Sequence, residues 1–210
     1  SKDNCDIFLG QFSNSDYLVQ HCGPSSMKRR EVTGEIDRKL RSIYAHYPDD
    51  ATWIIIGDHG MTDVAEELDI PEILAPLEFK HNVKMGTDYI VFLDSTMARF
   101  LWKTDRGKRF LNSVTQLPVL TAKGKFVDTA LAYDHGISLS DRRYGDVIWW
   151  ADPGILIFPD YFHDAHTHNR GMHGYDSNHD DMKGFFLSFG PGIKPVIIEQ
   201  ANLIDVCPSI

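Results

Sequence analysis

The most constraining feature of the sequence is a short apolar run at residues 52–57, Thr-Trp-Ile-Ile-Ile-Gly, bounded by aspartates. A continuous run of β-branched and aromatic residues of this length is typical of a strand that is buried on both faces of a parallel sheet. A helical rhythm precedes it at residues 27–47, where Val32, Ile36 and Leu40 recur among charged residues. We therefore predict an α/β fold with a mainly parallel central sheet, residues 52–57 as an interior strand, and helices on both faces.

Between residues 85 and 150 the sequence changes to a series of short strand-like and helix-like segments. Residues 89–93, 99–102 and 146–150 have the composition of strands, and residues 108–116 favour a helix. We predict that residues 85–150 form a small α/β layer inserted into the main fold.

The composition excludes several classes of protein. The chain is 42% hydrophobic and 24% charged, which favours a packed core over disorder. A formal net charge of -9 argues against a nucleic-acid-binding surface. No stretch reaches the roughly 18 apolar residues that a membrane-spanning helix requires, so we predict no membrane segment in this chain. Cys5, Cys22 and Cys207 show no metal-type spacing, and their odd number excludes a closed disulfide framework.

The strongest candidate site directly follows the apolar run, where Gly-Asp-His-Gly-Met occupies residues 57–61. Asp58 and His59 therefore lie at the carboxyl end of a predicted strand, where open α/β sheets place their ligands. A carboxylate oxygen beside an imidazole nitrogen suits Zn²⁺ or Mn²⁺. The alternative is that Asp58 caps a following helix and His59 is an exposed loop histidine.

Two further groups of residues could contribute metal ligands. Asp16 and His21 are separated by about one helical turn or a tight loop, although such a pair also arises often by chance. His173 lies between glycines in the long polar stretch at residues 159–181. Composition does not rank it against the other histidines of that stretch, which are His163, His166, His168 and His179.

These motifs together resemble the nucleotide pyrophosphatase/phosphodiesterase family of the alkaline phosphatase superfamily. The resemblance rests on residues 57–61, on Asp16 and His21 ahead of Gly-Pro at 23–24, and on Met-His-Gly-Tyr-Asp at 172–176. It covers nearly the whole chain and implies an alkaline phosphatase-like fold.

The resemblance implies hydrolysis of phosphodiester or pyrophosphate bonds through a covalent phospho-enzyme, with two divalent ions about 4 Å apart. Zinc is the expected ion and manganese the alternative. Asp16, His21 and His173 would hold one ion, while Asp58 and His59 would belong to the other. The family usually has three residues between its first Asp and its His, whereas this chain has four between Asp16 and His21. A phosphopentomutase-like relative also tolerates four.

The resemblance further implies that part of the site lies outside the chain. The family takes another Asp and a Thr or Ser nucleophile from an early strand, and nothing in residues 1–15 resembles that strand. We therefore expect residues 1–210 to be a partial catalytic domain without the N-terminal part that bears the nucleophile. Residues 85–150 would form its substrate-side subdomain. The expected substrate is a small phosphodiester or nucleotide, and the expected location is extracytoplasmic, whether secreted, periplasmic or membrane-anchored.

Two other interpretations stay open. One is a phosphonoacetate hydrolase-like or phosphoethanolamine transferase-like enzyme of the same superfamily, because the order of Asp16, Tyr17, Gln20 and His21 has a faint similarity to the phosphonoacetate enzymes. The other is a non-catalytic metal-binding or interaction domain that has lost its nucleophile.

Overall fold

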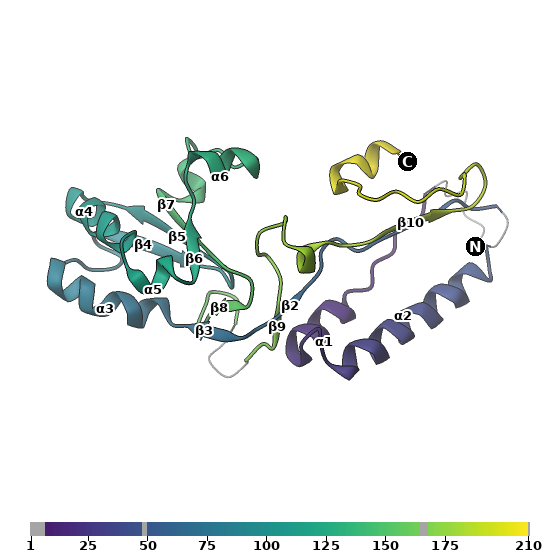
Figure 1. The fold of residues 1–210 in the computed structure, drawn as a ribbon, viewed down its shortest axis with the longest axis horizontal. Coiled ribbons are helices and arrows are strands. Elements are labelled where there is room, and N and C mark those ends of the chain that lie inside the picture. The colour runs from purple at the N-terminus through teal and green to yellow at the C-terminus, as the bar shows by residue number, and fades with distance from the viewer. Residues whose placement is uncertain (1–6, 48–49, 164–167, 210) are drawn as a thin grey trace.

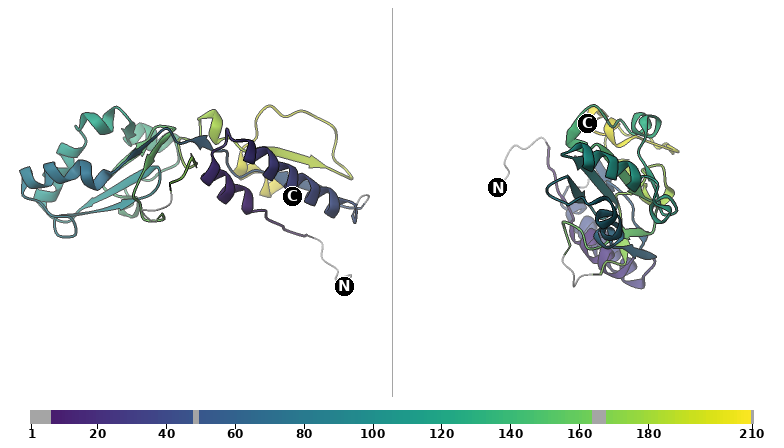
Figure 2. Two further views of the ribbon diagram at one scale, coloured as in Figure 1. Left: turned by 90° about the horizontal axis from the view of Figure 1, so that it is seen from below. Right: turned by 90° about the vertical axis from the view of Figure 1, so that its left-hand side faces the viewer.

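The computed structural model describes residues 7–47, 50–163 and 168–209, and these form an elongated molecule with two lobes (Figures 1 and 2). One lobe is built on a four-stranded antiparallel sheet in the order β4 (Tyr89–Leu93), β5 (Met97–Trp102), β7 (Val147–Ala151) and β6 (Gly124–Phe126). Its helices are α3 (Ile70–His81), α4 (Asp105–Val114), α5 (Pro118–Thr121) and α6 (Thr129–Asp134).

The other lobe contains helices α1 (Asn14–Cys22) and α2 (Met27–Tyr44) and the antiparallel pair β1 (Trp53–Ile56) and β10 (Phe186–Phe189). Two short strand pairs lie towards the middle of the molecule (Figure 1). They are β2 (Thr62–Asp63) with β9 (Gly171–Met172), antiparallel, and β3 (Glu66–Leu68) with β8 (Ile155–Ile157), parallel. Short 3₁₀ turns are η1 (Arg142–Tyr144), η2 (Asp180–Met182), η3 (Leu203–Asp205) and η4 (Cys207–Ser209). No helix within the described ranges has both the length and the hydropathy needed to cross a bilayer.

The main hydrophobic core lies between the four-stranded sheet and its helices. Helix α4 contributes Phe110, Leu111 and Val114, which are fully buried. Phe110 and Leu111 each lie about one helical turn before Val114, so the three residues form one apolar face of the helix. The ring of Phe110 packs on that of Tyr89, with 4.8 Å between centroids. The hydroxyl of Thr104 caps the helix by accepting a hydrogen bond from Gly107 N at 3.1 Å.

Several predicted elements are confirmed. The helix expected at residues 27–47 is α2, and the strands expected at 89–93 and 146–150 are β4 and β7. Helix α4 overlaps the helix expected at residues 108–116. These elements belong to a mixed α/β structure, as expected. Whether residues 85–150 act as an inserted substrate-side subdomain stays a prediction.

The predicted large, mainly parallel central sheet is wrong for the described residues. Residues 52–57 do contain a strand, β1, but its described backbone partner is β10, which runs antiparallel, with Trp53 opposite Phe189. The strand is also not buried on both faces, because its side chains are half-buried and Ile56 is 43% exposed. An apolar run predicts a strand, but the direction of its neighbour depends on which distant segment returns to it.

Phe110→Ala should have a large effect on the stability of the core. Removing a fully buried ring should lower the free energy of unfolding by about 3–5 kcal/mol, because the cavity can collapse only in part. The matched control is Phe79→Ala in α3, whose side chain is 90% exposed. It should change the free energy of unfolding by less than about 0.5 kcal/mol. Urea unfolding followed by circular dichroism measures both, and equal effects of the two variants would contradict this description of the core.

Candidate metal centre

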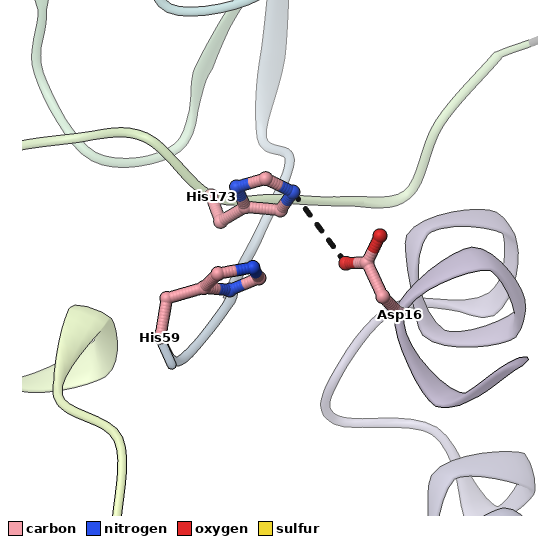
Figure 3. Close-up of side chains that lie close together, drawn as sticks. All are labelled: Asp16, His59 and His173. Atoms are coloured by element: carbon pink, nitrogen blue, oxygen red, sulfur yellow. Dashed lines mark ion pairs between the residues drawn. The ribbon is translucent and has the colours of Figure 1, made fainter. Parts of the chain in front are cut away.

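Three side chains from distant parts of the sequence converge near the middle of the molecule (Figure 3). Asp16 belongs to the first turn of α1, His59 follows β1, and His173 follows β9. Each offers one ligand atom, and these atoms all lie within 4.8 Å of one another. The Nε2 atom of His173 is 3.4 Å from Oδ1 of Asp16. The two imidazole rings stack, with 3.9 Å between centroids and 22° between planes.

The pairing of β2 with β9 brings the two histidines together. Thr62 lies opposite Met172, and the strands run antiparallel. The residue after Met172 therefore lies beside the residues that precede Thr62, which places His173 next to the loop carrying His59. That loop is held close to η2, because Gly60 N donates a hydrogen bond to Met182 O at 2.9 Å. A side chain at position 60 would collide with the carbonyl of Asp181, so this close approach requires glycine.

Helix α1 is attached to the same strand pair and carries Asp16 to the site. The backbone N–H of Arg170, just before β9, donates to Gln20 O at 2.7 Å. Gly171 leaves no room for a side chain, because a Cβ there would lie 2.9 Å from Val19 O. This close contact between α1 and β9 fixes the distance between Asp16 and His173.

The protonation of the histidines favours metal binding. Nδ1 of His59 lies 2.9 Å from Gly60 O and donates a hydrogen bond to it, so Nε2 is the ring nitrogen that remains for a metal ion. Burial lowers the pKa of His173, and the neighbouring His59 lowers it further. A lowered pKa favours the neutral imidazole, which is the form that binds metal ions.

Two of the five predicted ligands lie outside this group of three. The Asp58 side chain is 73% exposed, and its Oδ2 atom lies 3.8 Å from Nε2 of His59. His21 instead contacts its own helix, with Nδ1 2.8 Å from Tyr17 O and its ring on that of Tyr17. The reason is helical geometry, since a residue five positions after Asp16 is rotated from it by about 140° around the helix axis. The roles of all five residues as ligands stay predictions.

The competing histidines make other contacts. Nδ1 of His163 is 2.9 Å from Asp160, and Nδ1 of His168 is 2.9 Å from Glu67. His179 lies beside Asp181 in the turn at η2. The fourth competitor, His166, lies outside the described residues. Among the described histidines of this stretch, His173 is the one that lies in the group of three.

Sequence reasoning missed one residue of the site, Gln20. Its Nε2 atom lies 3.1 Å from Oδ2 of Asp16 and 3.1 Å from Nε2 of His173. A signal for it was present, because residues four positions apart on a helix lie on the same face. Three residues separate Asp16 from Gln20, which is the spacing that the family resemblance implied for the ligand pair.

A cavity of about 310 Å³ adjoins His173, one of the three converging side chains. It is lined by Gln20, Asp94, Ser95, Thr96, Met97, Phe162, His163, Met172, His173 and Gly174. Both hydroxyl groups in this lining already donate hydrogen bonds, Ser95 to Asp160 at 2.8 Å and Thr96 to Gly174 O at 2.9 Å. The volume of the cavity leaves room for a small molecule beside His173.

Comparisons with known proteins agree with the sequence motifs. A family model described as type I phosphodiesterase / nucleotide pyrophosphatase matches residues 1–176. Human ectonucleotide pyrophosphatase/phosphodiesterase family member 5 is 28% identical over 218 residues, which covers 100% of this chain and 42% of the relative. Human family member 7 is 24% identical over 201 residues, with 92% and 42% covered. The chain thus spans less than half the length of these relatives.

Solved structures share the fold. Human family member 5 superposes with a TM-score of 0.66 at 23% identity, over 84% of this chain and 45% of the other. The murine protein, in an inactive variant bound to AMP, gives 0.63 at 20% identity with the same shares covered. Phosphonoacetate hydrolase from Sinorhizobium meliloti 1021, bound to phosphonoacetate, gives 0.56 at 14% identity over 90% and 46%.

His173→Ala and His21→Ala should have different effects on zinc affinity. His173→Ala should weaken zinc binding at least ~100-fold, because even the partners of metal ligands contribute 10–100-fold. His21→Ala should leave the affinity within about two-fold, because its imidazole contacts Tyr17 instead. Competition with a chromophoric chelator measures both constants. A greater loss with His21→Ala than with His173→Ala would contradict the assignment.

Proposed function

Because the chain belongs to the type I phosphodiesterase/nucleotide pyrophosphatase family of the alkaline phosphatase superfamily, we propose that it supplies metal ligands to a hydrolase. The reaction is the cleavage of phosphodiester or pyrophosphate bonds in small molecules. The convergence of Asp16, His59 and His173 carries the proposal, because residues so far apart in sequence come within 4.8 Å of one another. Membership of a family does not by itself establish that this chain is catalytic.

The donor atoms fit a divalent transition-metal ion. One carboxylate oxygen and two neutral imidazole nitrogens are a common zinc ligand set, and manganese also accepts them. Asp58, which is exposed and has its Oδ2 atom 3.8 Å from Nε2 of His59, is a candidate ligand of a second ion. When bound, such ions supply Lewis acidity toward a phosphoryl oxygen. The ligands of this chain hold the ions, while the cavity orients the substrate beside His173.

We place the nucleophile outside residues 1–210. The covalent phospho-enzyme expected for this family needs an oxygen nucleophile held in line with phosphorus. The proposal rests on residues 1–15, where nothing resembles the early strand that carries the family's Thr or Ser nucleophile.

The cavity supports a small-molecule substrate and a role for residues 85–150 in its selection. The turn between β4 and β5, residues 94–97, forms part of the cavity lining. A volume near the lower end of typical ligand pockets suits a mononucleotide-sized group better than a polymer. The AMP complex of the murine relative is in keeping with this size. The relatives are named as ecto-enzymes, and we propose an extracytoplasmic location for this protein too.

A non-catalytic metal-binding protein is the second candidate. The observation that favours it is Gln20, a neutral side chain whose amide contacts two of the three converging residues. By contrast, the likeness to phosphonoacetate hydrolase concerns the fold, and it gives no information on the substrate of this chain.

Hydrolysis of a p-nitrophenyl phosphodiester with added zinc tests the proposal. We expect the longest protein that the gene encodes (the longest product) to be active. Residues 1–210 alone should show no turnover above background, because positioning a nucleophile contributes several orders of magnitude in rate. His173→Ala in the longest product should lower kcat/KM at least ~100-fold. The control, His21→Ala, should leave kcat/KM within about two-fold.

Two outcomes would contradict the proposal in different ways. Equal turnover by residues 1–210 and the longest product would place the nucleophile within this chain. A longest product that binds zinc without any hydrolysis would favour the non-catalytic candidate.

A further inference from the structure

The side chain of Gln20 makes contacts that a metal ion would otherwise make. Its Nε2 atom donates to both carboxylate oxygens of Asp16, at 3.1 and 3.3 Å, and lies 3.1 Å from Nε2 of His173. An amide nitrogen only donates hydrogen bonds, so Nε2 of His173 accepts and its proton lies on Nδ1. Both atoms that face the amide are therefore acceptors, each with a lone pair available for a cation.

The amide group is held in this place from two directions. The backbone carbonyl of Gln20 accepts a hydrogen bond from Arg170 N at 2.7 Å, which links Gln20 to the segment that leads into β9. Its position four residues after Asp16 puts both side chains on the same face of α1. The amide is thus fixed between the helix and His173, and it is half-buried there.

A carboxamide in this position competes with zinc. An NH₂ group has no lone pair to offer a metal ion, and the single lone pair of His173 Nε2 faces this group, so zinc can bind that nitrogen only if its hydrogen bond to the amide breaks. After rotation the amide offers Oε1, a neutral oxygen that binds zinc more weakly than the imidazole, carboxylate or thiolate groups that this ion prefers. Gln20 therefore supplies no strong fourth ligand to zinc, and its amide must be displaced before the ion binds.

We infer that Gln20 determines the zinc affinity of this centre: its amide takes the place of the ion in the metal-free chain and keeps zinc binding weak. This inference rests on the metal site of the proposed function but not on hydrolysis. In the metal-free chain the amide protons stabilise the Asp16 carboxylate and the His173 lone pair, so these two donor groups stay together without a cation.

Gln20→His tests the inference directly. The variant replaces the competing amide with an imidazole, so zinc affinity should rise by at least ~10-fold. The matched control is His21→Gln, which makes the reverse exchange at the adjacent position, where the side chain contacts Tyr17. It should leave the affinity within about two-fold. Competition with a chromophoric chelator gives the affinities, and circular dichroism establishes that both variants are folded.

Cobalt provides a second readout that needs no substrate. With Co²⁺ in place of zinc, Gln20→His should show the strong visible absorption of tetrahedral coordination, and the parent chain should show a weaker spectrum. An unchanged zinc affinity in Gln20→His would overturn the inference, while zinc binding by the parent chain that depends on His173 would still support the metal site. If the parent chain, Gln20→His and His21→Gln all fail to bind zinc, both the metal site and the inference about Gln20 are wrong.

Gln20→Glu separates the role of the amide from a merely structural one. The substitution keeps the shape of the side chain but removes its protons and places a second carboxylate beside Asp16. The metal-free variant should therefore unfold at a lower temperature than the parent chain, because like charges in contact repel. Zinc should raise its unfolding temperature by more than it raises that of the parent, because ligands stabilise the state that binds them. Equal unfolding temperatures of variant and parent, with and without zinc, would overturn the inference.

Discussion

The pairing of β2 with β9 is the interaction on which the rest of the site depends. It joins residues before and after the four-stranded lobe, with Thr62 opposite Met172, and so sets His173 beside the loop that carries His59. Helix α1 is held to the same pair through the hydrogen bond from Arg170 N to Gln20 O. Because each short strand has few backbone hydrogen bonds of its own, the tight approaches at Gly60 and Gly171 are needed to keep the segments in register. A shift of one residue in this pairing would move His173 to the other face.

The cluster also poses an electrostatic problem that the metal-free chain must solve. A half-buried carboxylate and two stacked imidazoles lose hydration when they come together, and each needs a polar partner. Gln20 supplies protons to Asp16 and His173, and Gly60 O fixes the tautomer of His59. The site is therefore preorganised by hydrogen bonds rather than by charge pairing. The same bonds that hold the donors together must be broken when an ion enters, so preorganisation and metal affinity oppose each other here.

Family membership and fold answer different questions about this chain. The family model and the curated relatives place it among phosphodiesterases and nucleotide pyrophosphatases. The superposed structures, all below 25% identity, establish a shared architecture that also serves a phosphonoacetate hydrolase. Function must therefore be argued from the site itself. At that site His21 contacts Tyr17, and Gln20 faces Asp16 and His173.

The elements and motifs whose signals are local could be predicted from the sequence. The periodicity of residues 27–47 predicted α2, the composition of residues 89–93 predicted β4, and the motif at 57–61 together with that at 172–176 identified the family. The antiparallel partner of β1, the position of His173 beside Asp16 and His59, and the place of Gln20 in the site became visible only in the folded chain. An apolar run is the same whichever strand returns beside it, and a histidine-rich loop has the same composition wherever it folds. These choices depend on contacts between segments that are distant in the chain, and such contacts leave no periodic signal in the sequence.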